Sequence, residues 1–298
     1  MPTTHPDNPV TRQRRERFLS RQSVIEMRAR ERARALLDPG TFRELLGPFD
    51  HLESPWLPLQ GVVPESDDGV IIARGQLAGR PAVIMAIEGA FQGGGMGEVS
   101  ASKIAAALAL ARRDCERGNP ILPVLLLETG GVRLQEANLG EAVVAEIHAE
   151  IVALRRHVPV IGVITGMVGC FGGMSITAGL CSYLVAFPQG RLELNGPEVI
   201  EQEAGIDELD ASDKQLVWSL MGGEQRYETG FVDALVEDDA KQLKQAILEL
   251  AARGVPARHR SERVEEYRRR LAEIDPAAPP DGPALRRLWR PGHSGKEE

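Results

Sequence analysis

Cysteine is scarce in this chain of 298 residues, which contains only Cys115, Cys170 and Cys181. Their number is odd and no Cys-x-x-Cys pair occurs, so neither a disulfide framework nor a cysteine-based zinc site is expected. The first residues also lack the apolar core of an export signal, because residues 1–8 are polar and residues 10–37 are rich in arginine. These absences predict a reduced, cytoplasmic protein without structural zinc.

Long hydrophobic runs are missing too, except that residues 158–188 contain no charged side chain and carry six glycines. About 20 apolar residues suffice to cross a bilayer, so a membrane span is one interpretation of this stretch. The other is a buried strand over 158–165, a glycine turn over 166–173, a buried helix over 172–179 and a second strand over 182–187. The β-branched residues favour the second interpretation, and no membrane association is expected.

Motifs of covalent or nucleotide chemistry are absent as well. Gly173-Met-Ser-Ile-Thr177 departs from the Gly-x-Ser-x-Gly nucleophile pattern at its last position. Gly93-Gly-Gly-Met-Gly97 lacks the Lys-Ser/Thr of a Walker loop, and Glu98 stands where a dinucleotide loop has its third glycine. Because this loop opens a predicted helix, it is interpreted either as a cradle for a phosphate or thioester chain or as a tight packing turn. Glu88 and Glu128, with Glu98, are the acids nearest the glycine loops and stay open as candidates.

Two further reactive side chains have structural interpretations. His148 lies on a predicted surface helix, where a solvated role is expected rather than catalysis. Cys170 lies in a glycine turn and is interpreted as a small core residue, with a reactive thiol left open.

The net charge of −8 is unevenly distributed along the chain. Residues 1–37 contain nine arginines and four acidic residues, whereas residues 38–255 contain 16 basic and 31 acidic residues. An acidic body would repel phosphate and no recognition module follows, so nucleic-acid binding is not expected. Residues 11–37 are predicted to form one polar helix with a thin apolar stripe. Such a helix is not stable by propensity alone, so we expect it to be solvated or to dock on a partner subunit.

The central part of the chain repeats one pattern. After a predicted hairpin over residues 69–87, a strand, a glycine turn and a helix follow one another three times, with turns at 93–97, 128–135 and 166–173. This alternation predicts an α/β fold with mainly parallel strands, whose ligands bind where turns leave the strand ends. We divide the chain into a basic N-terminal helix (1–37), an α/β domain (38–255) and a basic, proline-containing C-terminal tail (256–298).

Since motifs of covalent and nucleotide chemistry are absent, the chemistry that remains is stabilisation of negative charge by backbone N–H groups. Gly130-Gly131 and Gly172-Gly173 each precede a predicted helix, where amides without helical partners hold negative charge. One well-placed donor stabilises an oxyanion by about 2.7–4 kcal/mol in the transition state. Decarboxylation of a malonyl thioester needs such donors and no nucleophile, because the electrons left behind by carbon dioxide collect on the thioester oxygen.

Several motifs, which occur in the order that the family has them, resemble the β-type carboxyltransferase half of acyl-CoA carboxylases. They are Ala29-Arg-Glu-Arg32 with Leu36-Leu-Asp-Pro-Gly-Thr-Phe42, Gly93-Gly-Gly-Met-Gly97, Thr129-Gly-Gly-Val-Arg-Leu-Gln-Glu-Ala137, Phe171-Gly-Gly-Met-Ser-Ile-Thr-Ala178 and Asn195-Gly-Pro-Glu-Val-Ile-Glu-Gln202. The resemblance implies a crotonase-like fold of ββα units. It also implies a thioester that lies across an interface with a homologous second half.

By position, the resemblance implies two sets of site residues and no metal ligand. The oxyanion donors would be the amides of Gly130, Gly131, Val132, Gly172 and Gly173. The residues on the acyl-carrier side would be Gly93, Gly94, Gly95, Met96 and Gly97. The same motifs offer Arg133, Gln135 and Ser175 as candidate substrate contacts.

One departure narrows the resemblance. The four-cysteine zinc ribbon of bacterial acetyl-CoA carboxylase β subunits is missing, so the whole chain looks most like the β subunits of biotin-independent malonate decarboxylases. This implies a lyase that converts malonyl-S-acyl carrier protein to the acetyl form, with the acyl group on a phosphoribosyl-dephospho-CoA thiol and without biotin. It also implies a heterooligomer with a homologous γ subunit, the acyl carrier protein and a transferase α subunit.

Two alternatives stay open. A carboxyltransferase β subunit of a biotin-dependent acyl-CoA carboxylase forms the same enolate, so glycine turns do not separate it from a decarboxylase. A non-catalytic scaffold that presents the carrier protein belongs to another class. The scaffold predicts that Gly131 or Gly172 tolerates a bulky side chain without loss of turnover.

Overall fold

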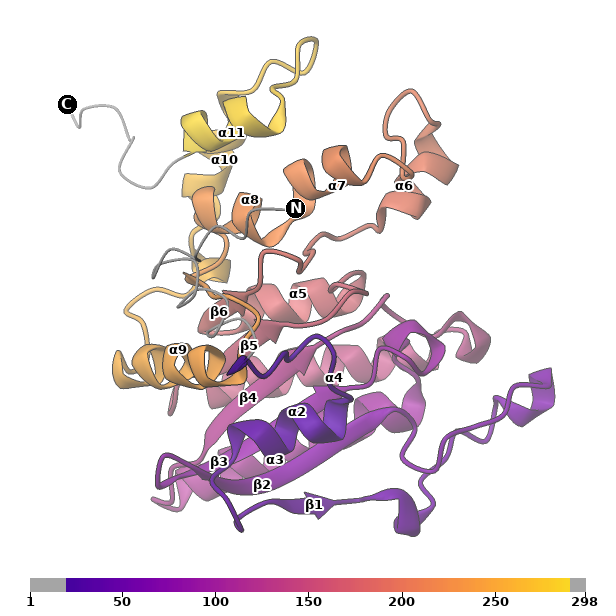
Figure 1. The fold of residues 1–298 in the computed structure, drawn as a ribbon, viewed down its shortest axis with the longest axis vertical. Coiled ribbons are helices and arrows are strands. Elements are labelled where there is room, and N and C mark those ends of the chain that lie inside the picture. Colours follow the sequence, from indigo (N-terminus) through magenta and orange to yellow (C-terminus); the bar gives the residue numbers. More distant parts are fainter. Residues whose placement is uncertain (1–19, 290–298) are drawn as a thin grey trace, which may run out of the picture.

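The computed structural model describes residues 20–289, which fold around a seven-stranded sheet (Figure 1). The strands lie in sequence order: β1 (Arg43–Leu45), β2 (Val70–Leu77), β3 (Arg80–Ile87), β4 (Leu122–Leu127), β5 (Ile161–Ile164), β6 (Tyr183–Ala186) and β7 (Ala234–Leu235). The first three pair antiparallel, and β3 to β7 pair parallel. The predicted α/β fold with mainly parallel strands is confirmed.

Helices alternate with these strands. The α-helices of the described residues are α2 (Ala29–Leu36), α3 (Glu98–Glu116), α4 (Leu139–Leu154), α5 (Gly173–Leu180), α6 (Pro197–Ala204), α7 (Lys214–Met221), α8 (Gly223–Glu228), α9 (Ala240–Ala252), α10 (Val264–Ala272) and α11 (Gly282–Trp289). Short 3-10 helices are η1 (Pro48–Asp50), η2 (Pro58–Gln60), η3 (Gln92–Gly94), η4 (Leu134–Glu136) and η5 (Arg260–Glu262). The predicted helices that follow the three glycine turns are confirmed as α3, α4 and α5.

The predicted hairpin over residues 69–87 is confirmed, since β2 and β3 pair antiparallel over their whole length. Its turn, Ala78-Gly79, has positive φ at both residues (51° and 76°), as expected for a turn that follows the twist of the strands. Asp38 fixes the turn, because its carboxylate accepts the N–H groups of Ala78 and Gly79 at 3.0 and 2.8 Å.

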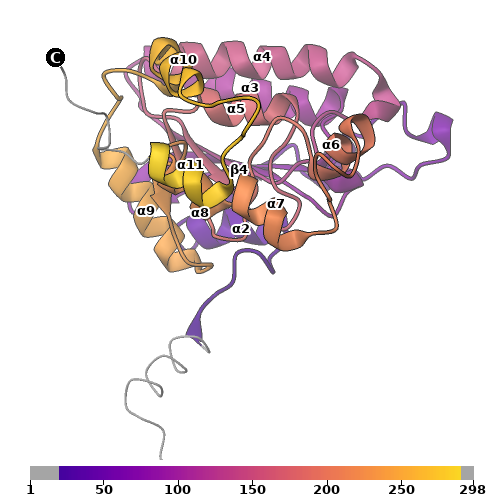
Figure 2. The same cartoon turned by 90° about the horizontal axis from the view of Figure 1, so that it is seen from above.

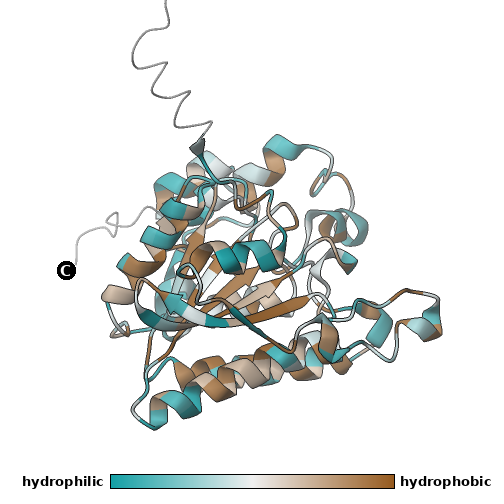
Figure 3. Ribbon diagram, turned by 60° about the horizontal axis from the view of Figure 1, so that its bottom comes forward, coloured by the Kyte–Doolittle hydropathy of each residue, from teal (hydrophilic) through white to brown (hydrophobic). Residues whose placement is uncertain are grey.

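Alternate residues of the strands contribute to two separate cores. Val70 and Ile72 belong to the core with α3, α4 and α5, whereas Ile71 and Ala73 belong to the core with α2 and α9. This is the period of two expected for a sheet covered on both faces. Figure 2 shows the two groups of helices on opposite sides of the sheet, and Figure 3 shows the hydrophobic strands between them.

The charge-free stretch over residues 158–188 is divided among β5, a glycine turn, α5 and β6, as the second interpretation predicted. All residues of β5 and β6 are buried, which explains why this part of the sequence is so apolar. Within residues 20–289, no helix is long and apolar enough to cross a membrane.

Of the single helix predicted over residues 11–37, residues 29–36 are confirmed as α2, but the prediction is wrong for residues 21–28. These residues are not helical and contain a turn over 24–27. The physical reason lies far away in the sequence, because the Asp238 carboxylate accepts the N–H of Val24 (2.7 Å) and that of the next residue (3.0 Å). A side-chain acceptor thus competes with the helical hydrogen bonds. The part of the prediction before residue 20 lies outside the described residues.

Helix α2 finds support for its apolar face within the chain. It buries Ala29, Arg32, Ala33 and Leu36, whose spacing places them on one face, and this face packs on β2, β3 and α9. The thin apolar stripe of this segment is sufficient because the sheet of the same chain covers it.

The residues predicted as a C-terminal tail contain α10 and α11 within the described part. Both helices pack on the body, since Tyr267 stacks on Phe231 with ring centroids 5.3 Å apart and Trp289 is buried. Residues 290–298 of the predicted tail lie outside the described residues.

Candidate functional site: two glycine turns in contact

The glycine loops that follow β3 and β4 are joined by backbone hydrogen bonds. Gly130 N–H donates to Gly93 O at 2.9 Å, and Met96 N–H donates to Gly131 O at 2.8 Å. A third bond runs from Arg133 N–H to Met96 O at 2.9 Å. The carboxyl ends of two neighbouring parallel strands thus continue as one compact structure.

The loop that follows β5 joins this structure from the other side. Thr129 N–H donates to Gly169 O at 2.8 Å, and Phe171 N–H donates to Thr129 O at 3.0 Å. The predicted turns at Gly130-Gly131 and Gly172-Gly173, about 40 residues apart in sequence, therefore lie side by side at the edge where ligands bind in parallel sheets.

Gly131 and Gly172 form the contact between the two turns. A Cβ atom built on Gly172 would lie 3.0 Å from Gly131 Cα, and one built on Gly131 would lie 3.4 Å from Gly172 Cα. Both residues also have positive φ, at 116° and 60°, which favours glycine. A side chain at Gly172 therefore requires movement of the other turn, whereas at Gly131 it is the backbone conformation that disfavours a side chain.

The five amides predicted as oxyanion donors are not equivalent. Three of them already donate to oxygens of the chain: Gly130 N–H to Gly93 O (2.9 Å), Gly131 N–H to Thr129 Oγ1 (3.0 Å) and Gly172 N–H to Leu194 O (2.7 Å). The other two, at Val132 and Gly173, have no hydrogen-bond acceptor among residues 20–289. One unpaired donor therefore remains on each turn.

Gly173 is the first residue of α5, where amides have no helical partner and the helix dipole favours negative charge. The Ser175 hydroxyl donates to Gly172 O at 2.8 Å and so braces this turn. His148 Nε2 lies 3.0 Å from Gly173 O and from Thr177 Oγ1. The interpretation of His148 as a solvated surface residue is therefore wrong, because it is half-buried and links α4 to the donor turn.

The loop over residues 93–97 also opens a helix, but two amides in the first turn of that helix are occupied. At the start of α3, Glu98 N–H donates to Glu136 Oε2 at 2.7 Å, and Ser100 N–H donates to Asp68 Oδ2 at 2.9 Å. The chain's own carboxylates thus hold the positions in which an anion would bind at a helix N-terminus.

Arg133 completes this carboxylate cluster. Its Nη1 donates to Asp68 Oδ1 at 2.8 Å and to Glu136 Oε1 at 2.7 Å, and all three side chains are almost fully buried. Its guanidinium also lies over the Phe91 ring, 5.3 Å from the centroid. Arg133 Nε and Nη2 have no hydrogen-bond partner in the described part of the chain. The side chain therefore faces the interior, while Gln135, two residues on, is exposed.

The segment between β1 and β2 contacts the same loops from outside. The Trp56 indole N–H donates to Glu98 Oε2 at 2.8 Å, and the Gln60 amide donates to Gln135 O. Ser54 Oγ, which is buried, lies 2.6 Å from Glu136 Oε1. This segment projects from the body beside the glycine loops (Figure 1).

Each of the three acids left open by the sequence has a structural partner. Glu88 accepts Ala29 N–H, the first amide of α2, at 3.0 Å, and Glu98 accepts Trp56. Glu128 is buried and pairs with Arg32.

The thiols of the central core are not poised as nucleophiles. Cys170 and Cys181 are fully buried, and burial raises the pKa of the Cys170 thiol far above its ordinary value and that of Cys181 to about 12. A thiol acts as a nucleophile only as thiolate, so the interpretation of Cys170 as a small core residue holds.

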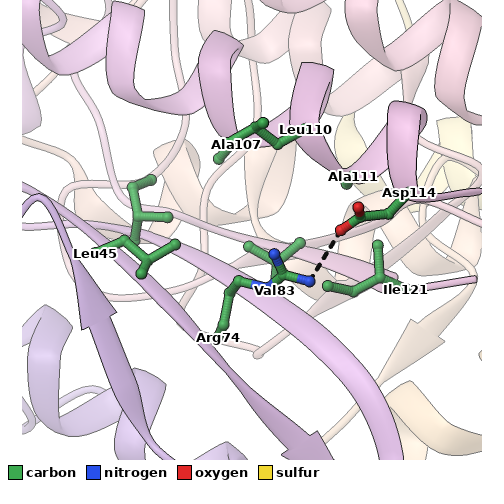
Figure 4. A pocket seen from close by; sticks show the side chains of 9 residues that line it. Leu45, Arg74, Val83, Ala107, Leu110, Ala111, Asp114 and Ile121 are labelled. Atoms are coloured by element: carbon green, nitrogen blue, oxygen red, sulfur yellow. Dashed lines mark hydrogen bonds and ion pairs between the residues drawn. The ribbon is translucent and has the colours of Figure 1, made fainter. Parts of the chain in front are cut away.

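A small apolar pocket exists at the opposite end of the sheet (Figure 4). It is lined by Leu45, Val83, Leu110 and Ile121 among others, and an ion pair between Arg74 and Asp114 at 2.9 Å lies beside it. Ile121 directly precedes β4, and Val83 pairs with Pro123 near the start of that strand, whereas the glycine turns follow the carboxyl ends of the strands. The pocket is thus separate from the unpaired amides.

Reasoning from the sequence missed the residues that support the turns: Arg32, Asp68, Thr129, Glu136 and His148. Thr129 and Glu136 stand in the motif that contains Gly130 and Gly131, and this position is the signal that could have drawn attention to them. The contacts of Arg32, Asp68 and His148 with the turns join distant parts of the sequence, which no local pattern reports.

Comparison with known proteins agrees with this architecture. Residues 26–282 match the carboxyl transferase domain family. The malonyl-S-ACP:biotin-protein carboxyltransferase of Malonomonas rubra is 42% identical over 237 residues, which are 76% of this chain and 74% of that protein.

Two solved structures are more similar. A chain of a Pseudomonas malonate decarboxylase hetero-tetramer in complex with malonate is 58% identical, with a TM-score of 0.90 over 92% of this chain and 99% of that one. A chain of the Pseudomonas malonate decarboxylase MdcD-MdcE hetero-dimer is 54% identical, with a TM-score of 0.72 over 84% and 97% of the two chains. The crotonase-like fold of carboxyltransferases, which the motifs implied, is confirmed.

Proposed function

This chain belongs to the carboxyl transferase domain family, and from that premise we propose that it is the β subunit of a malonate decarboxylase. The reaction is malonyl-S-acyl carrier protein plus a proton to acetyl-S-acyl carrier protein plus carbon dioxide. The observation that carries the proposal is the contact between Gly131 and Gly172, which brings together two turns that each carry one unpaired amide.

In the proposed mechanism the bond between the malonyl α-carbon and its free carboxylate breaks. The electron pair moves into the thioester, carbon dioxide leaves, and negative charge develops on the thioester oxygen. The N–H groups of Val132 and Gly173 are the donors available to that oxygen, because the amides of Gly130, Gly131 and Gly172 are paired within the chain. A proton then adds to the α-carbon and gives the acetyl thioester.

The chain supplies this chemistry by position rather than by reactive side chains. Donors fixed before the reaction cost no reorganisation when charge appears, and each stabilises the transition state by about 2.7–4 kcal/mol. Hydrogen bonds from Gly131 and Gly172 to Thr129 and Leu194 keep the two turns rigid. Ser175 and His148 brace the turn that carries Gly173.

The finer assignments rest on the family resemblance. We propose that the acyl group is carried on a phosphoribosyl-dephospho-CoA thiol of the carrier protein, and that a homologous γ subunit and a transferase α subunit complete the enzyme. The MdcD-MdcE hetero-dimer of Pseudomonas supports a subunit partner of this kind. Of the residues proposed for the carrier side, Gly93 is exposed and suits such contact; of the candidate substrate contacts, exposed Gln135 suits the role better than buried Arg133.

Carboxyl transfer to a biotin protein is the second candidate, favoured by the name of the Malonomonas relative. It uses the same enolate and the same donors. The likeness at 58% identity to a chain of a Pseudomonas malonate decarboxylase supports the first candidate more strongly.

One assay separates the two candidates. The chain is purified together with its partner subunit, and carbon dioxide release from malonyl-S-acyl carrier protein is measured with and without avidin. Release that avidin leaves unchanged is expected for a decarboxylase. Release that requires a biotin protein would overturn the proposal in favour of carboxyl transfer.

A further inference from the structure

Glu128 lies where all three glycine loops meet, yet it has no part in the mechanism above. It directly follows β4 and precedes the turn with Gly130 and Gly131. A Cβ atom built on Gly94, in the loop after β3, would overlap its carbonyl oxygen, and one built on Gly166, in the loop after β5, would overlap its carboxylate. The loops are therefore packed around this one residue.

The carboxylate of Glu128 holds the loop that leads to the second donor turn. Its Oε1 accepts Met167 N–H at 3.0 Å and lies 3.5 Å from the N–H of Val168. Four residues further along the chain stands Gly172, in contact with Gly131. A single side chain thus connects the turn that it precedes with the turn that it binds.

A buried carboxylate needs a cationic partner, and α2 provides it. Arg32 Nη1 pairs with Glu128 Oε2, and the two side chains are only 4% and 8% exposed. The other donors of Arg32 bind Val24 O at 2.8 Å and Ile25 O at 3.1 Å, so its position is fixed from both sides. The N-terminal segment is thereby tied to the glycine loops.

We propose that Glu128 is a positioning residue, which sets the distance between the two donor turns, and that Arg32 of α2 keeps its carboxylate in place. The inference rests on the proposed function of these turns. It gives the N-terminal segment a role in catalysis, because a turn displaced by about 1 Å costs roughly 100-fold in rate.

The test uses Glu128→Gln, Arg32→Met and Arg32→Lys in the complex purified with its partner subunit. Glu128→Gln and Arg32→Met are expected to lower kcat roughly 10- to 100-fold, with KM within about twofold of the wild-type value, because donors move while carrier contacts stay. Arg32→Lys keeps the charge and is expected to restore much of the lost kcat.

Arg30→Met is the matched control on the same helix. Arg30 pairs with Glu44 at 2.8 Å and Asp67 at 2.6 Å, neither of which belongs to the turns over residues 128–135 and 166–173. Its substitution is expected to lower the melting temperature with kcat within about twofold of wild type. A kcat loss for Arg30→Met equal to that for Arg32→Met would overturn the positioning role in favour of general destabilisation.

Amide hydrogen exchange gives a readout that does not depend on activity. The peptide over residues 166–173 is expected to exchange faster in Glu128→Gln and Arg32→Met than in Arg30→Met. The inference is overturned if Arg32→Met shows unchanged exchange and full kcat. This result decides even where Glu128→Gln does not assemble. A wild-type complex that transfers carboxyl to biotin instead contradicts only the proposed function, and the same kcat comparison is then made on that transfer.

Discussion

Two of the helix N-termini that follow glycine turns, those of α3 and α5, differ in whether their first amides are paired within the chain. At α3, the carboxylates of Asp68 and Glu136 occupy the amides of Ser100 and Glu98. At α5, the amide of Gly173 has no acceptor in the described part of the chain. Similar sequences thus give one site closed by the protein itself and one site left available for an oxyanion.

The difference shows that a glycine-rich loop before a helix is not by itself an anion site. Whether such a loop can bind an anion depends on whether carboxylates of the chain already accept the amides of the helix N-terminus. Arg133 makes this possible at α3, because it compensates two carboxylates that would otherwise be buried without a cation.

The largest expected effect comes from breaking the closed site, which is the carboxylate cluster at the start of α3. Arg133→Met would leave Asp68 and Glu136 buried without their cation, and removal of one member of a buried ionic cluster costs about 3–5 kcal/mol of unfolding free energy. Urea unfolding monitored by circular dichroism measures it. A loss below about 1 kcal/mol, with a strongly raised KM, would instead make Arg133 a substrate contact.

Breaking the open site is expected to affect turnover more than stability. Gly172→Val places a branched side chain at a φ of 60° and 3.0 Å from Gly131 Cα, so the two turns must separate. We expect turnover of the assembled complex to fall roughly 10²–10³-fold, the effect of losing one oxyanion donor.

The control for this substitution lies in α5, the helix that Gly172 precedes. A Cβ atom built on Gly179 meets no heavy atom within 4 Å, so Gly179→Ala is expected to leave turnover unchanged. An assembled Gly172→Val complex with wild-type turnover would favour the non-catalytic scaffold.

The pH dependence of stability sharpens the comparison further. Burial, the largest single effect, raises the pKa of Glu136, but hydrogen bonds from Ser54, Glu98 and Arg133 together hold it below its ordinary value of 4.5. A lowered pKa in the folded state stabilises the fold above pH 4.5, and this contribution disappears as pH falls through the folded-state value.

Glu136→Gln is therefore expected to cost about 1–3 kcal/mol at pH 7 and clearly less near pH 3. Urea unfolding of both proteins at the two pH values measures the difference. A cost independent of pH would mean that the size of the side chain, and not its charge, is what α3 requires.

Local patterns predicted the parts of the fold that depend on local residues. The apolar runs of β2 and β3 and the glycines at 130–131 and 172–173 can be recognised because strands and tight turns are specified within a few residues. The same patterns could not show which amides are free. Asp68 reaches Ser100 from 32 residues away, and no local pattern reports such a partner.

The error in the N-terminal helix has the same origin. Arginine-rich residues 11–37 have helical propensity, but Asp238 binds the backbone at Val24 from more than 200 residues away. Tertiary contacts overrode a preference that is worth only tenths of a kcal/mol per residue. The long-range partners of Asp238, Asp68 and Glu128 are the features that sequence reasoning could not identify.

The smallest expected effect concerns Ser175, which the motifs offered as a substrate contact at the open site. Its hydroxyl donates to Gly172 O at 2.8 Å, but the Ser175 N–H also donates to that oxygen at 3.0 Å. Ser175→Ala therefore leaves no carbonyl unpaired, and turnover is expected to fall less than about threefold. A steady-state assay of the complex that gave a loss of tenfold or more would mean that the hydroxyl turns away from Gly172 to bind the substrate. The open site would then use a side chain as well as backbone amides. It would differ from the site at α3 in its side chains as well as in its unpaired amides.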